Sequence, residues 1–108
     1  MHYLLFYEKA PDYAVRERPL QAAHRAHVFA AVERGELELG GPLADPDDGA
    51  NVLLFRAESI DVPTRFAKDD PYVTGGVVSR WHIRPWHTVV GPQAAKPLTP
   101  PQPASQAK

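Results

Sequence analysis

The fold of this chain is decided by residues 18–42, which read RPLQAAHRAHVFAAVERGELELGGP. Pro19 suits the first position of a helix and Gly35 suits the residue just past its end, whereas Arg18, which precedes the proline, is expected to be extended. Apolar side chains recur at helical spacing over residues 20–34. This spacing predicts an amphipathic helix whose apolar stripe is formed by Leu20, Val28, Ala31 and Val32.

His24 lies on that apolar stripe. A histidine ring that faces a protein core without a hydrogen-bond partner costs roughly 1–3 kcal/mol. We therefore expect a partner for His24 from a distant part of the sequence.

The remaining segments complete a two-layer fold. Glu36 to Leu39 alternates with a period of two and predicts a strand that Gly40-Gly41-Pro42 stops. Ser59 is suited to cap a second helix, with Pro63 in its first turn and Pro71 at its end. The side chains expected to point inward from this helix are Ile60, Val62, Phe66 and Ala67. Further strands are predicted over residues 2–8, 51–57 and 77–86.

The resulting order, β-α-β-β-α-β, predicts an α+β ferredoxin-like fold. This fold has a four-stranded antiparallel sheet with both helices packed on one face. The first and third strands are apolar on both sides, so the opposite face of the sheet also needs cover. We expect a second copy of the chain to supply it, which gives a homodimer through sheet faces, with Trp86 as a candidate contact.

Composition divides the 108 residues into two parts. Residues 1–91 form the predicted domain. Residues 92–108 are rich in proline, alanine and glutamine, and such a segment buries too little apolar surface to order itself, so we expect an irregular tail that adds nothing to the fold.

Several classes of protein are excluded. The chain has no cysteine, which rules out disulfides and thiolate chemistry. Acidic residues outnumber basic ones by 13 to 12, and without a basic patch we expect no nucleic-acid partner. The first residues lack a signal peptide pattern, and no apolar run is long enough for a membrane span, so we expect a cytoplasmic location.

The sequence resembles the YciI-like (YCII-related) family of the dimeric α+β barrel superfamily over nearly all of residues 1–90. Its most specific pieces are the eleven-residue step from His24 to Gly35 and the block Asp70-Pro71-Tyr72-Val73. Other matching residues are Arg18-Pro19, Leu37, Gly41-Pro42, Glu58-Ser59, Gly76-Val77 and Ile83-Arg84-Pro85. The resemblance implies that His24 and Asp70 meet in an active-site pocket. It also implies a possible enzyme, since a few relatives look like lyases or dehalogenases that act on chlorinated aromatic ring-cleavage products.

A His-Asp pair suits proton transfer, because a carboxylate orients the imidazole and stabilises its cation. We expect His24 and Asp70 to be catalytic, without a cofactor or a metal. Arg16 or Arg18 could hold a carboxylate or an enolate-like oxygen of the substrate. The Gly40-Gly41-Pro42 corner would allow close approach of a ligand. The candidate substrate-binding residues are Arg16, Arg18, Gly41, Pro42 and Tyr72.

Structural alternatives remain open for each candidate. His24 could be a core histidine, and Asp70 followed by Pro71 is a good helix cap. The arginines could be solvated, and Gly41-Pro42 could be a simple turn. A metal at His24 and His27 lacks a third ligand at sensible spacing.

Two functions are consistent with these residues. One is a small cofactor-independent enzyme of lyase, isomerase or dehalogenase type that acts on a small carboxylated or aromatic-derived substrate. The other is a non-catalytic dimeric module that binds a small molecule or another protein.

Overall fold

The computed structural model describes residues 1–101. Its strands are β1 (His2–Lys9), β2 (Leu37–Pro42), β3 (Asn51–Arg56) and β4 (Val78–Trp86). Its helical segments are α1 (Tyr13–Glu17), the 3-10 turn η1 (Arg18–Leu20), α2 (Gln21–Glu33), α3 (Asp61–Asp69) and α4 (Pro71–Thr74).

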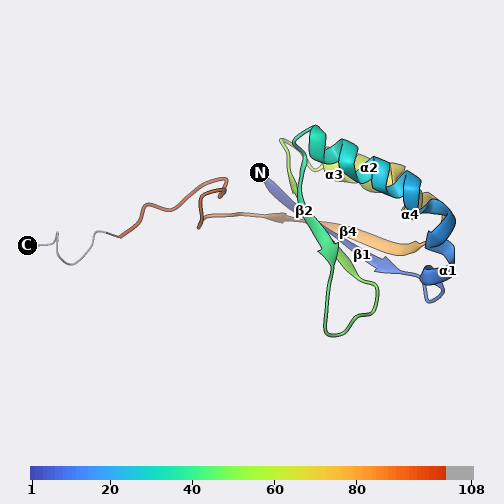
Figure 1. Cartoon of the computed structure of the whole chain (residues 1–108). Helices are drawn as coiled ribbons and strands as arrows, with labels where there is room; N and C mark the ends of the chain where they lie inside the picture. Colours follow the sequence, from blue (N-terminus) through green and yellow to red (C-terminus); the bar gives the residue numbers. More distant parts are fainter. Residues whose placement is uncertain (102–108) are drawn as a thin grey trace, which may run out of the picture.

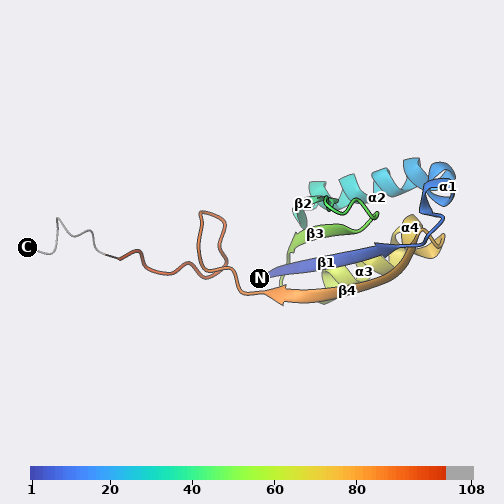
Figure 2. The same ribbon diagram turned by 90° about the horizontal axis from the view of Figure 1, so that it is seen from below.

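The four strands form one antiparallel sheet in the order β2-β3-β1-β4. Figure 1 shows α2 and α3 together on one face of this sheet. Figure 2, turned to look from below, shows α2 toward β2 and α3 toward β1 and β4. The predicted ferredoxin-like fold is therefore confirmed.

The core lies between the helices and the sheet, and β1 supplies its centre. Alternate side chains of β1 point toward the helices because a strand has a period of two, and Tyr3, Leu5 and Tyr7 are at most 7% exposed. Lys9 is the next residue in this row and is half-buried. An ammonium group therefore stands at the end of an otherwise apolar row.

The first helical region begins earlier than the sequence indicated. Two further helical segments, α1 and η1, come before α2. Arg18 is helical, with φ −52° and ψ −53°, so the prediction that Arg18 is extended is wrong. Pro19 lies at the start of η1. A backbone N–H at this position has no partner within the helix, so the N–H that proline lacks costs no helical hydrogen bond. Gly35 follows α2 with φ of +76°, and the Glu36 N–H donates to the Ala31 carbonyl at 3.0 Å. This is the expected glycine end of the helix.

The glycines after the second predicted strand do not stop it. Gly40 and Gly41 pair with Leu53 and Val52 of β3, so the predicted corner at Gly40-Gly41-Pro42 is wrong. β2 ends at Pro42, and a proline is tolerated there because β2 is an edge strand.

The Ser59 side chain stabilises the start of α3, because its Oγ accepts a hydrogen bond from the Asp61 N–H at 3.0 Å. Ile60 was expected to point inward but is exposed. The helix starts only at Asp61, so its buried positions are Pro63, Phe66 and Ala67.

Residues 87–98 fold back on themselves beyond β4. The Leu98 N–H donates to the Val89 carbonyl at 2.7 Å. Arg56 ties the segment to β3, because its Nη2 donates to the Gln93 carbonyl at 2.7 Å. The first part of the proline-rich segment is thus hydrogen-bonded to the domain. The last part of the predicted tail, residues 102–108, lies outside the described residues.

None of the helices in residues 1–101 has the length and apolar character that a bilayer crossing requires.

Candidate functional site

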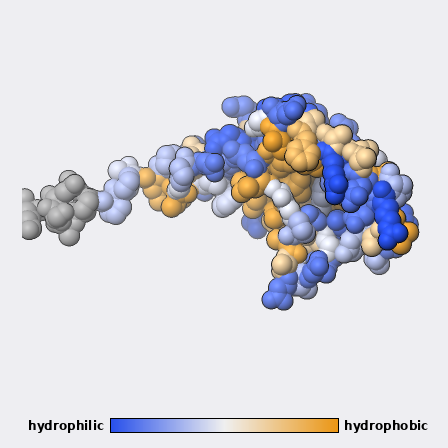
Figure 3. Space-filling view, viewed as in Figure 1, coloured by the Kyte–Doolittle hydropathy of each residue, from blue (hydrophilic) through white to orange (hydrophobic). Residues whose placement is uncertain are grey.

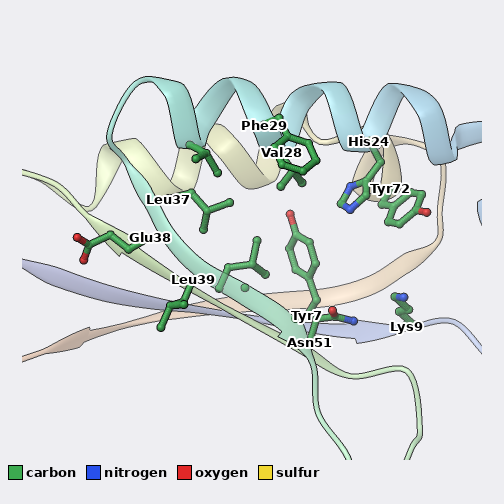
Figure 4. Close-up of a pocket in the computed structure, with 14 residues that line it drawn as sticks. Tyr7, Lys9, His24, Val28, Phe29, Leu37, Glu38, Leu39, Asn51 and Tyr72 are labelled. Atoms are coloured by element: carbon green, nitrogen blue, oxygen red, sulfur yellow. The ribbon is translucent and has the colours of Figure 1, made fainter.

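A pocket of about 310 Å³ opens between α2 and the strands β1, β2 and β3. This volume suits a small molecule, since ligand sites usually measure about 300–1,000 Å³. Figure 4 shows His24, Tyr72 and Lys9 at one end of the pocket and Leu37, Leu39 and Glu38 toward the other. Most of its wall is apolar, from Val28, Phe29, Val32, Leu37, Leu39 and Leu53. The polar side chains of His24, Tyr72 and Lys9 therefore gather at one end, and the rest of the wall is mostly apolar.

His24 and Asp70 meet at the polar end. The Nδ1 atom of His24 lies 2.8 Å from Oδ1 of Asp70. The Asp70 side chain is 0% exposed, whereas the His24 side chain is 19% exposed and lines the pocket. The predicted partner of the stripe histidine is thus a carboxylate 46 residues away in the sequence.

Asp70 also caps α4. Its Oδ1 atom accepts a hydrogen bond from the Tyr72 N–H at 2.9 Å, and Pro71 occupies the first helical turn. The cap places the Tyr72 ring parallel to the His24 ring, with centroids 3.7 Å apart and an interplanar angle of 5°. The capping role and the pairing with His24 therefore coexist in one residue.

Tyr7 completes the surroundings of the buried carboxylate. Its hydroxyl donates to Oδ2 of Asp70 at 2.8 Å. Burial, reinforced by the negative charge of Asp70, raises the pKa of the Tyr7 phenol well above its ordinary value. Tyr7 consequently stays a neutral donor at physiological pH.

These contacts determine which nitrogen of His24 is free. A carboxylate oxygen only accepts hydrogen bonds, so Nδ1 carries the proton that His24 donates to Asp70. Within residues 1–101, every buried side-chain nitrogen and oxygen has a hydrogen-bond partner, but Nε2 of His24 has none. Nε2 is therefore accessible, and in the neutral ring it keeps a lone pair that can take a proton.

A family model for the YCII-related domain matches residues 1–87. The chain belongs to the YCII-related family. No curated protein is significantly similar to it in sequence.

Solved structures share the fold of this YCII-related chain. The 5-chloro-2-hydroxyhydroquinone dehydrochlorinase TftG from Burkholderia phenoliruptrix AC1100, in complex with 2,5-dihydroxybenzoquinone, superposes with a TM-score of 0.68. The two sequences are 23% identical, over 82% of this chain and 95% of TftG. Protein Atu4242 from Agrobacterium tumefaciens has a TM-score of 0.52 and 11% identity, over 88% of this chain and 98% of its own.

Of the other predicted site residues, two line the pocket and three lie outside it. Tyr72 and Gly41 line the pocket, and a Cβ atom at Gly41 would meet nothing within 4 Å, so this backbone borders open space. Pro42 lines a groove on the helix-free face of the sheet instead. Arg16 and Arg18 are exposed and outside the pocket wall.

Arg16 has a local partner. Its Nε donates to Oδ2 of Asp12, one helical turn earlier, at 2.8 Å. This contact lowers the pKa of the Asp12 carboxyl.

Tyr7, Lys9 and Asn51 line the pocket but were not singled out from the sequence. The alternation of β1 could have indicated two of them, because Tyr7 and Lys9 continue the buried row of Tyr3 and Leu5. No comparable local pattern marks Asn51.

The rim of the pocket is apolar. Phe29 of α2 is 65% exposed and Leu39 of β2 is 68% exposed, and both line the pocket. Figure 3 shows apolar side chains gathered on the surface where α2 meets β2. Exposed apolar side chains therefore form part of the pocket wall that solvent reaches.

His27, one helical turn after His24, has a structural role. Its Nε2 lies 2.8 Å from the Phe66 carbonyl, and its ring stacks on the Phe66 ring. Residues 1–101 contain no group of three or more His, Asp or Glu side chains arranged to hold a metal ion.

Replacing Asp70 with alanine removes an acceptor that three donors share. We expect Asp70→Ala to lose about 3 kcal/mol of the free energy of unfolding, because it leaves buried donors without a partner. Urea denaturation measures this loss. The matched control is Asp69→Ala at the exposed preceding residue, with a change within about 0.5 kcal/mol. Equal stability of the two variants would contradict the central role of Asp70.

Tyr7 gives the fold a specific alkaline sensitivity. Because the folded pKa of its phenol is raised, the unfolded chain loses this proton first, and stability falls as pH rises above about 10. Tyr7→Phe lacks this dependence. The difference in unfolding free energy between wild type and Tyr7→Phe should therefore shrink by up to about 1.4 kcal/mol per pH unit above that point. Denaturation at several alkaline pH values tests this, and a constant difference would contradict it.

Proposed function

We propose that this YCII-related protein is a small cofactor-independent enzyme in which His24 transfers a proton on a ligand bound in the pocket. The observation that carries the proposal is the 2.8 Å contact between His24 Nδ1 and Asp70 at the pocket wall. It leaves Nε2 free to act as a base.

The reaction starts when Nε2 takes a proton from an O–H group, or from a C–H group beside a carbonyl. The electron pair moves into the ligand and forms a phenolate or an enolate, while Asp70 stabilises the imidazolium. Return of the proton to another carbon gives an isomerisation. Expulsion of a leaving group such as halide, with loss of the proton from His24 to solvent, gives a net elimination of HX.

The pocket and the structural relative support this class of reaction. The mostly apolar wall of the pocket and the polar side chains around His24 suit a small aromatic-derived or carboxylated compound. TftG, which shares the fold, is named as a dehydrochlorinase and was solved with a benzoquinone. Elimination from a hydroxylated ring is therefore the first reaction to test.

Loss of the imidazole should remove turnover and leave the fold intact. In a screen of small carboxylated and halogenated aromatic-derived compounds, we expect His24→Ala to lower kcat/KM at least about 100-fold for any compound that wild type converts. Circular dichroism checks folding. His87→Ala, at an exposed histidine outside this pocket, is the matched control and should keep full activity.

A fully active His24→Ala variant would refute the mechanism. If wild type binds compounds from the screen but converts none, the non-catalytic binding module is the correct function.

We also propose that the protein is a homodimer through the helix-free face of the sheet. This face carries Leu4, Phe6, Val52 and Leu54, which are only half-buried. An exposed Trp86 borders an apolar groove on the same face. A second copy of the same surface is its simplest cover, because a two-fold axis pairs like with like.

A charge on the helix-free face should separate the subunits. We expect Leu54→Glu to be monomeric by light scattering at micromolar concentration, where wild type is dimeric, because a dimer would bury the new carboxylate. The control is Val15→Glu at an exposed residue of α1, which should stay dimeric. A monomeric wild type would contradict the dimer.

A further inference from the structure

Lys9 ends β1, and its side chain lies in the pocket. This side chain is only 13% exposed, and Lys9 is the sole lysine or arginine in the pocket wall. Moving an ammonium group out of water is costly unless anions or hydrogen-bond acceptors surround it. The contacts of Lys9 therefore indicate which kind of ligand the pocket binds.

Those contacts leave most of the N–H donors of the Lys9 ammonium without an acceptor. One carboxylate approaches it, and Nζ lies 3.4 Å from Oε2 of Glu17, longer than the usual 2.7–2.9 Å of a charge-assisted hydrogen bond. The rings of Tyr13 and Tyr72 lie 5.0 Å and 5.7 Å from Nζ. Aromatic faces stabilise a cation but do not use its N–H groups. An ammonium has three donors, and two of them have no acceptor among the described residues.

We propose that Lys9 is the anion-binding residue of the pocket and that the natural ligand carries an ionised oxygen, a carboxylate or a phenolate, on a planar ring. This deepens the proposed function and rests on its pocket being the ligand site, but not on His24 acting as a base. Lys9 takes the role that the sequence suggested for Arg16 or Arg18, which are exposed and outside the wall.

The position of Lys9 fits the position of His24. The Tyr72 ring stacks on the His24 ring, and the same Tyr72 ring lies against Lys9. Both groups therefore lie next to the same Tyr72 ring, and we expect one small ring ligand to contact Nζ with its ionised oxygen and Nε2 with another atom. The other charged residue of the wall, Glu38, lies toward the opposite end of the pocket (Figure 4). Its carboxylate is occupied by His2 and Arg56.

The test compares benzoate with benzamide, which has nearly the same shape but no charge. Isothermal titration calorimetry measures both dissociation constants at neutral pH and low salt. We expect wild type to bind benzoate at least about tenfold more tightly than benzamide, the size of one partly exposed charge-assisted contact. Lys9→Met should remove this preference, because it weakens benzoate binding more than benzamide binding: the amide carbonyl accepts only a neutral hydrogen bond from the ammonium.

Two further variants separate this role from a structural ion pair. Glu17→Gln frees the ammonium from its present partner and should strengthen benzoate binding. Lys68→Met, at an exposed lysine of α3, is the matched control and should keep the wild-type preference. An ion pair that only stabilises the fold predicts instead that Lys9→Met and Glu17→Gln destabilise the protein and leave the ratio of the two dissociation constants unchanged. That result would overturn the proposal.

Repeating the titration with His24→Ala distinguishes this proposal from the proposed enzyme. A preference for benzoate that depends on Lys9 and persists in His24→Ala supports anion binding even if no turnover is ever found. A wild-type protein that binds neither probe at millimolar concentration, or binds both equally, overturns the role of Lys9.

Discussion

Burial of the Asp70 carboxylate is the constraint on which the rest of the site depends. The side chain is 0% exposed, and an ionised carboxylate in that position is tolerated only when its oxygens accept enough hydrogen bonds. The donors come from three elements: Tyr7 on β1, His24 on α2 and the backbone of Tyr72 on α4. Satisfying one charge therefore fixes a strand and two helices relative to each other. The same requirement holds the imidazole at the pocket wall, so the hydrogen bonds that stabilise the fold also fix the position of the proposed base.

The two interpretations that the sequence allowed for Asp70 are not exclusive, and the geometry shows why. A helix cap needs one carboxylate oxygen near the first N–H groups of the helix, and Oδ1 meets this need at Tyr72. The same atom has a second lone pair for His24, while Oδ2 remains for Tyr7. Because α4 consists of only four residues, the cap also decides where the Tyr72 ring points. The structural role and the proposed chemical role thus depend on the same three hydrogen bonds.

Local pattern was sufficient to predict some of these features from the sequence. The helical stripe placed His24 on the buried side of α2, and the order of strands and helices gave the ferredoxin-like topology. The predictions fail where contacts between distant segments of the chain determine the structure. Gly40 and Gly41 are poor strand formers but stay in β2 because β3 pairs with them. Arg16 and Arg18 are close to His24 in the sequence, yet their side chains stay outside the pocket. Lys9 lies in the buried row of β1, but its ring neighbour Tyr72 is 63 residues further along the chain and no local rule brings the two together.

Charge balance in the pocket links the two proposed roles. Transfer of a proton from a ligand hydroxyl to Nε2 creates an imidazolium beside Asp70 and an oxyanion at the polar end where Lys9 lies. Each new charge then meets an opposite charge that the pocket already supplies, and such charges stabilise a transition state. The apolar wall strengthens both interactions, because Coulomb energies rise as water is excluded. The long contact between Lys9 and Glu17 fits this arrangement, since a loosely held ammonium loses little attraction when it turns to the developing oxyanion.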